Sequence, residues 1–177
     1  MAEQLDHILG TDYLGRLEQR DMDELRSMRA ECQEVETGLS YLRRLVQGRL
    51  DIVGGELHRR REGGEPGDLG ELVKRLPEIL SDHTRGPGLG RLPQLMAPGE
   101  VDPDLTGDLD AITTVTDLES LSTLSDEALV DVCERLEGFE REVSDRRRAL
   151  FDRIDALQGE VTRRYKSGEA SVESLLQ

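Results

Sequence analysis

Apolar residues in this chain recur at alternating spacings of three and four, the heptad pattern of helices that pack along one seam. The first run has one extra residue after its seventh member and consists of Leu25, Met28, Cys32, Val35, Leu39, Leu42, Val46, Leu50, Val53 and Leu57. A cap formed by Asp21 and Glu24 and a stop at Gly63 predict a helix over residues 21–62. At about 1.5 Å per residue it would be roughly 60 Å long, too long to be buried around one compact core.

The same pattern returns near the C-terminus. The second run has Arg146 at one core position and otherwise consists of Leu129, Val132, Leu136, Phe139, Val143, Leu150, Ile154, Leu157 and Val161. Ser125 is a suitable N-cap and Gly168 a suitable stop. This run predicts a second long helix over residues 125–166.

The two runs are copies of one segment. A shift of 104 residues superimposes 36–56 on 140–160, and eight of the 21 positions are then identical. Three of the identities are the arginine pairs Arg43 and Arg147, Arg44 and Arg148, and Arg49 and Arg153. A shared apolar seam is expected of any two such helices, whereas shared polar residues beside the seam indicate an internal duplication.

Each helix exposes a narrow apolar face that needs a partner. If the helices pair antiparallel with their ends aligned, residue 43 falls within one turn of residue 147. Aligning the helix ends and aligning the equivalent residues 43 and 147 of the two copies therefore predict the same register. The sequence therefore predicts an all-α fold: a long antiparallel two-helix coiled coil with a partly helical, Gly/Pro-rich connection. Homodimerisation through the seam into a four-helix bundle is an alternative.

The connection, residues 63–124, holds half of the 18 glycines and all six prolines. Its apolar spacing predicts one short amphipathic helix near 69–80, and its second half is acidic. Because such a connection is unusually long, it is either a flexible linker or a segment that orders on a partner. Residues 1–20 form a separate N-terminal segment with scattered apolar residues, and residues 167–177 a C-terminal tail.

The composition narrows the function. Charged residues make up 34% of the chain and aromatics 3%, with a formal charge of −15, which argues against direct DNA binding. An acidic surface suits a basic protein partner, although acidity can also serve solubility alone. Without a signal peptide or membrane span the chain is expected to be cytoplasmic. The cysteines are expected to be reduced core residues, and no metal-ligand set or catalytic nucleophile–base pair is visible.

Polar residues form a matching stripe beside each seam. Their spacing confines the first stripe to an arc of roughly 80° on its helix. The first polar stripe consists of Glu36, Ser40, Arg43, Gln47 and Asp51, and the second of Glu140, Ser144, Arg147, Phe151 and Asp155. In an antiparallel pair, these positions of one helix flank those of the other, so both stripes are expected on one side, related by a pseudo-two-fold axis. We expect them to line one groove.

The residue types in the stripes suit a guanine nucleotide. Arginine presents a planar fork of donors to phosphate or to the O6/N7 edge of guanine, and carboxylates accept from the N1–H and the N2 amine. A doubled, symmetric set suits a cyclic dinucleotide, whereas ATP or GTP sites usually need a Gly-rich loop that is not visible here. The alternative is that the stripes form only surface ion pairs. The protein would then be a ligand-independent structural coiled-coil adaptor.

The first stripe, E-x3-S-x2-R-x3-Q-x3-D, resembles the cyclic-di-GMP signature of the RsiG family of anti-sigma factors of sporulating actinobacteria. The resemblance covers both long helices, roughly half of the chain, and the second copy departs from the pattern at Phe151. It implies that the stripe residues bind cyclic-di-GMP as a dimer, held between the helical hairpin and a WhiG-like sporulation sigma factor. The sigma factor would thereby be sequestered from core RNA polymerase. The Phe151 ring would stack on a base or pack against the partner.

Overall fold

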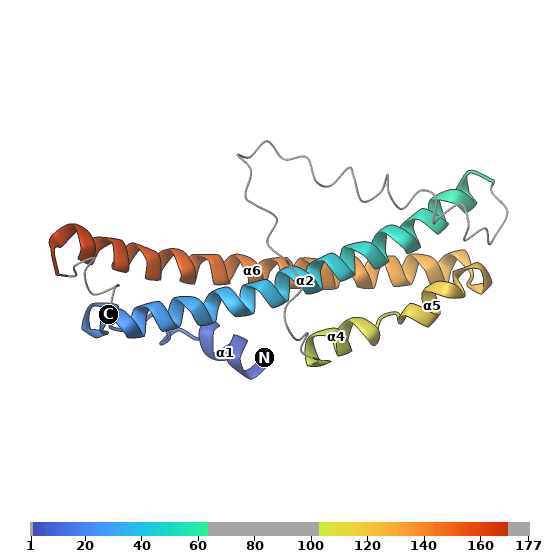
Figure 1. Cartoon of the computed structure of the whole chain (residues 1–177). Coiled ribbons are helices and arrows are strands. Elements are labelled where there is room, and N and C mark those ends of the chain that lie inside the picture. Colours follow the sequence, from blue (N-terminus) through green and yellow to red (C-terminus); the bar gives the residue numbers. More distant parts are fainter. Residues whose placement is uncertain (1, 64–102, 170–177) are drawn as a thin grey trace. The chain divides into compact units, whose positions relative to one another are not determined.

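In the computed structural model, residues 2–63 and 103–169 are described, and the regular secondary structure of this part is entirely helical (Figure 1). Two long helices dominate it: α2 spans Met22–Arg61 and α6 spans Asp126–Ser167. Each end lies within one residue of the end predicted from the heptads. The short helix predicted near 69–80 lies outside the described residues.

Local hydrogen bonds explain where the long helices begin and end. The backbone N–H of Glu24 donates to Asp21 Oδ1 (2.7 Å), and Glu24 Oε2 accepts from the N–H of Asp21 (3.0 Å), which is a capping box. Ser125 caps α6 by accepting from the N–H of Ala128 (3.2 Å). Gly63 and Gly168, just beyond the helix ends, have φ of +80° and +78°, a conformation that favours glycine at helix C-termini. The predicted caps and stops are confirmed.

The described chain forms two compact units, and both long helices pass through each. Unit 1 comprises Met1–Ser40 and Ser144–Gln177, and unit 2 comprises Tyr41–Val143. In unit 1, Arg26 bonds to Tyr165 and Glu36 to Arg147. As the numbers rise along α2 they therefore fall along α6. Unit 2 shows the same antiparallel order, in which Arg43 meets Glu140 and Arg60 meets Asp126.

The heptad residues form the core of each unit. Most of those predicted are at most 8% exposed. In unit 1 they are Leu25, Cys32, Val35, Leu39, Leu150, Leu157 and Val161, and in unit 2 Leu42, Val46, Val53, Leu57, Leu129, Leu136 and Val143. Burial of these seams supplies the main favourable free energy of pairing. Both cysteines are free thiols; Cys32 is fully buried, as expected of a core residue, whereas Cys133 is only half-buried and the expectation was wrong for it.

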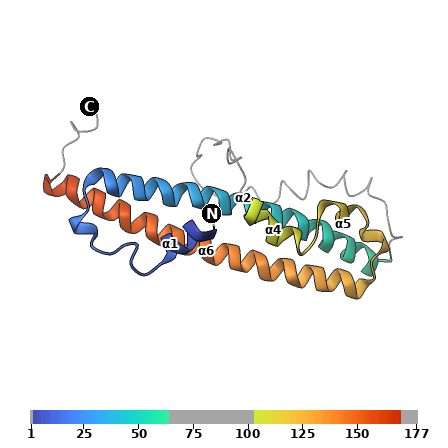
Figure 2. The same ribbon diagram turned by 90° about the horizontal axis from the view of Figure 1, so that it is seen from below.

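In unit 1 the N-terminal segment packs onto the helical pair (Figure 2). Helix α1 spans Ala2–Leu9 and buries Leu5 and Ile8, and the 3-10 helix η1 spans Leu17–Gln19. Arginines of α6 bind the carbonyl oxygens at which these elements end. Arg153 donates to the carbonyls of Ile8 (3.3 Å) and Leu9 (3.0 Å).

The second of these arginines holds the 3-10 turn. Arg164 donates to the carbonyls of Arg20 (2.6 Å) and Leu17 (2.8 Å). Its side chain is 9% exposed and also pairs with Glu160. These bonds tie the start of the chain to α6.

Unit 2 contains equivalent elements: α4 (Pro103–Asp110), α5 (Val115–Glu119) and the 3-10 helix η2 (Leu121–Thr123). Arg49 of α2 donates to the carbonyls of Leu109 and Thr113 and pairs with Asp110. The segment 103–124, predicted as part of the connection, therefore docks on the chain's own helices.

A second arginine of α2, Arg60, binds the 3-10 helix η2. Arg60, in the Arg59–Arg61 cluster at the end of α2, would by position only complement the helix dipole. Instead it donates to the carbonyls of Leu121 (2.8 Å) and Leu124 (2.7 Å) and pairs with Asp126. It thus holds η2 as Arg164 holds η1.

The duplication is therefore larger than the long helices. With the same shift of 104, η1 matches η2, α2 and α6 begin at matching residues, and Arg49 and Arg60 match Arg153 and Arg164. Residues 1–20 share five identities with 105–124, namely Leu5, Asp6, Ile8, Leu14 and Leu17 with Leu109, Asp110, Ile112, Leu118 and Leu121. Each copy consists of a short helical segment followed by a long helix. No helix of the described part is sufficiently long and apolar to span a bilayer.

We predict that Arg49→Met destabilises the protein by about 2–3 kcal/mol, because it leaves backbone carbonyls and Asp110 without their charged donor. Urea denaturation measures the loss, and hydrogen exchange should show faster opening of α4. Arg148→Met, at an exposed position, is the control and should change stability by less than about 0.5 kcal/mol. Equal effects of the two variants would contradict the assignment of Arg49 to α4.

Glu160 provides a pH-dependent contribution to stability. Its ion pairs, first with Arg163 and then with Arg164, lower the pKa of this carboxyl from 4.5 to about 2. A lowered pKa means that the contribution is present above pH 4.5 and is lost as the pH falls toward about 2. We therefore expect Glu160→Gln to flatten the acid limb of a thermal-stability profile between these values. An unchanged acid limb would show that the pairs do not form in solution.

Candidate functional site

The antiparallel pairing distributes each polar stripe over both units. Two sets of stripe residues result. Half-site 1, in unit 1, holds Glu36, Ser40, Ser144, Arg147, Phe151 and Asp155; half-site 2, in unit 2, holds Arg43, Gln47, Asp51 and Glu140. Each half-site thus combines the Arg end of one copy of the motif with the Glu of the other copy.

In half-site 1, the carboxylate of Glu36 is the common acceptor. Arg147 donates to Glu36 Oε1 from Nη2 (2.9 Å) and Nε (3.2 Å), and the Ser40 hydroxyl donates to the same oxygen (2.5 Å). The side chains of Arg147 and Glu36 are 20% and 17% exposed. The guanidinium carbon of Arg147 also lies 5.6 Å from the centre of the Phe151 ring, within the range of a cation–π contact.

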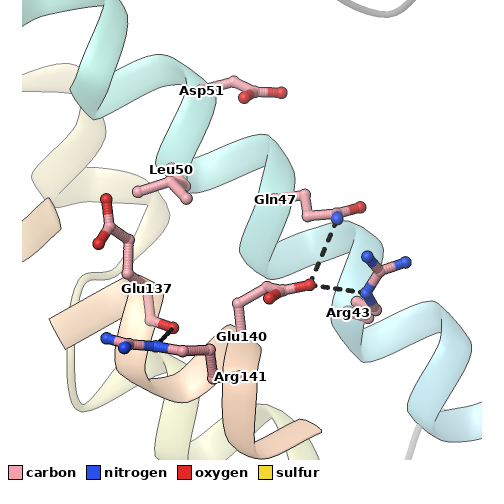
Figure 3. A pocket seen from close by; sticks show the side chains of 7 residues that line it. All are labelled: Arg43, Gln47, Leu50, Asp51, Glu137, Glu140 and Arg141. Atoms are coloured by element: carbon pink, nitrogen blue, oxygen red, sulfur yellow. Dashed lines mark hydrogen bonds and ion pairs between the residues drawn. The ribbon is translucent and has the colours of Figure 1, made fainter. Parts of the chain in front are cut away.

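In half-site 2, Glu140 has the equivalent role. Arg43 Nε donates to Glu140 Oε1 at 2.7 Å, and Gln47 Nε2 lies 3.4 Å from the same oxygen. Figure 3 shows Arg43 and Gln47 converging on this carboxylate from α2. A pocket of about 480 Å³ opens beside it and is lined by Arg43, Gln47, Leu50, Asp51, Glu137, Glu140 and Arg141.

The remaining stripe residues lie farther along the helices: Ser144 is three residues from Arg147, and each aspartate is eight residues, about two turns, from the arginine of its stripe. Asp51 lines the pocket of half-site 2, with its carboxylate directed away from Glu140 (Figure 3). Asp155 lines a different pocket, of about 570 Å³, together with Gln158, Thr162 and Arg163. Ser144 lies half-buried on α6. The structure therefore brings Glu, Arg and Ser or Gln together in each half-site, with the aspartates at the margin.

Three residues of the pocket in half-site 2 were not expected from the stripes. Leu50 belongs to the apolar seam, while Glu137 and Arg141 flank Glu140 on α6. Arg141 Nε donates to the backbone carbonyl of Glu137 (3.2 Å). Glu137 precedes Glu140 by three residues, so its helical phase places it on the same side. This spacing was the sequence signal that could have predicted Glu137 in the pocket.

The arrangement leaves two arginines half-buried, each oriented by a carboxylate of the other copy. A half-exposed ion pair of this kind is worth about 1 kcal/mol or less. The same guanidinium can instead make charge-assisted hydrogen bonds to a phosphate, or a pair of hydrogen bonds to the edge of a guanine. A ligand can thus displace or share these bonds at little cost, while the carboxylates remain available to accept from donors on the ligand.

A double-mutant cycle on Arg147→Ala and Glu36→Gln should give a coupling free energy of about 1 kcal/mol or less, smaller at high salt, with helicity by circular dichroism unchanged. The pair is partly exposed, so its loss does not unfold the seam. The cycle is measured by urea denaturation. A coupling of about 3 kcal/mol, or loss of helicity, would instead make the arginine a structural residue.

The comparison with protein families identifies one match. The model of the RsiG-like family matches residues 11–80 and 115–177, and the two matched segments begin at equivalent positions of the two copies. Together they include all ten stripe residues and more than half of the chain. No curated protein matches the chain.

Proposed function

Because this chain belongs to the RsiG-like family, a family of regulatory anti-sigma factors rather than of enzymes, we propose that it is an anti-sigma factor gated by cyclic-di-GMP. In the ligand-bound state it sequesters a WhiG-like sporulation sigma factor from core RNA polymerase in the cytoplasm. The observation that carries the proposal is the crossed pairing of the motif, in which Arg43 meets Glu140 and Arg147 meets Glu36.

The crossed pairs match the chemistry of guanine. An arginine fork donates to O6 and N7, and a neighbouring carboxylate accepts from N1–H and the N2 amine. One Arg–Glu pair can therefore bond to both the acceptors and the donors of a guanine base. The buried Ser40 hydroxyl donates to Glu36 and thereby helps to orient its carboxylate. Because the chain carries two such sets, a nucleotide with two guanines, or a dimer of it, is the ligand that uses both.

The charge of the chain supports a sigma factor as the partner. With 38 acidic and 23 basic residues, the chain has a formal charge of −15. Sigma-factor surfaces that bind DNA must be cationic to neutralise phosphates. An acidic protein is attracted to such surfaces and competes for them. The bound nucleotide adds negative charge between the two proteins, which makes binding of the partner depend on the ligand.

A ligand-independent coiled-coil adaptor is the rival function. One observation favours it: in each half-site the arginine and the glutamate are already paired with each other. On this view the stripes are only ion pairs that keep the two helices in register. The two functions differ in whether the partner's affinity depends on the nucleotide.

Calorimetry of the full chain with the sigma factor separates these functions. We expect tight binding in the presence of cyclic-di-GMP and at least about tenfold weaker binding without it. Arg43→Ala and Arg147→Ala should each remove most of this nucleotide dependence, because each deletes a bidentate donor. Arg148→Ala, the exposed neighbour of Arg147 on the same helix, is the matched control and should bind as the unmodified chain does. Equal affinity with and without nucleotide would support the adaptor and exclude gating.

A further inference from the structure

The two half-sites differ in composition although they descend from one motif. Half-site 1 has Phe151 where half-site 2 has Gln47, and outside the half-sites Arg29 of unit 1 corresponds to Cys133 of unit 2. Each difference gives unit 1 a side chain whose interactions with a nucleotide the matching residue of unit 2, Gln47 or Cys133, cannot make. A phenylalanine ring offers a face for stacking, and arginine offers a cation for phosphate.

Phe151 is an exposed aromatic residue beside the ion pair of half-site 1. It is 44% exposed, although the heptad seam next to it buries Leu150 completely. Arg147 is held between Glu36 (2.9 Å) and the ring (5.6 Å from its centroid). The ring is therefore fixed next to the guanidinium while a large part of its surface is in contact with solvent. An aromatic face beside an arginine fork is a common way to hold a nucleobase by stacking and edge contacts together.

Arg29 extends the same side of α2. It precedes Glu36 by seven residues, which is two helical turns, so the two residues share one face of the helix. Arg29 is half-buried, and within residues 2–63 and 103–169 its buried Nε has no hydrogen-bond partner. A buried donor without an acceptor is unfavourable, so a rotation of the Arg29 side chain that turns its guanidinium toward an anion of the ligand breaks no hydrogen bond of Nε. The matching residue of unit 2, Cys133, has no cation to offer.

We propose that half-site 1 binds a purine base by stacking on Phe151, with Arg147 on the base edge and Arg29 as a further cation for the phosphate. This inference rests on the proposed nucleotide function and deepens it. Half-site 2 holds its base by hydrogen bonds from Arg43 and Gln47 without a stacking surface. The two half-sites are therefore unequal, and half-site 1 is the tighter.

The absence of tryptophan from the sequence allows a direct test. Phe151→Trp introduces a single indole at the proposed stacking surface, and its fluorescence should be quenched by cyclic-di-GMP. Val115→Trp, in unit 2 at a position that is 64% exposed and outside both stripes, is the control and should not be quenched. If the nucleotide binds the chain only with the sigma factor, the titration is run in the complex and the signal of the unmodified complex is subtracted. Binding by calorimetry without quenching at position 151 overturns the proposal.

Affinity measurements separate stacking from other roles of the ring. Phe151→Ala and Phe151→Leu should both weaken cyclic-di-GMP binding about tenfold or more, because leucine is apolar but cannot stack. Arg29→Ala should weaken binding and reduce its salt dependence, with Arg148→Ala as the control. Unchanged nucleotide affinity in Phe151→Leu, with weaker sigma-factor binding in Phe151→Ala, would assign the ring to a protein contact and overturn the proposal. If the unmodified chain binds no cyclic-di-GMP with or without the sigma factor, the proposed function itself fails.

Discussion

Antiparallel burial of the two apolar seams is the constraint on which the site depends. Because the copies run in opposite directions, the first half of one long helix packs beside the second half of the other, and the Glu of each motif meets the Arg of the other. If the two helices were parallel and equivalent residues of the two copies lay side by side, Glu36 would lie near Glu140 and Arg43 near Arg147, so that like charges would face each other. The duplicated motif therefore forms attractive pairs only in the antiparallel register, and the ion pairs select the same register as the seam.

A second set of interactions attaches the short segments to the helical pair. Arginines of the long helices donate to the carbonyl oxygens at the ends of α1, η1, α4 and η2, which are acceptors that the end of a helix leaves without a full set of backbone donors. Because these bonds involve charged donors with little exposure, such as Arg49 at 11% and Arg164 at 9%, each is stronger than a surface ion pair. The half-site pairs are more exposed and weaker. The chain thus keeps its stable interactions in the scaffold and its easily exchanged ones at the candidate site.

The sequence predicted the scaffold well for physical reasons. Heptad spacing is a long, redundant signal, and the helix ends were defined by Asp21, Ser125 and two glycines whose roles are local. The second copy of the short segment was missed. Its identity with residues 1–20 is limited to five apolar and acidic positions, and its docking depends on arginines 60 to 64 residues away in the chain, which no local pattern reveals.

The sequence by itself determined the two helices, the duplication and the residue types of the two polar stripes, because periodicity fixes which side chains share a face of a helix. The tertiary structure decided how those residues combine. It joined the Glu of each copy to the Arg of the other, placed the Phe151 ring against Arg147, and used Arg60 and Arg164 to bind backbone carbonyls rather than to complement a helix dipole. Such choices depend on distances between segments far apart in the chain, and these exist only after the seams have packed.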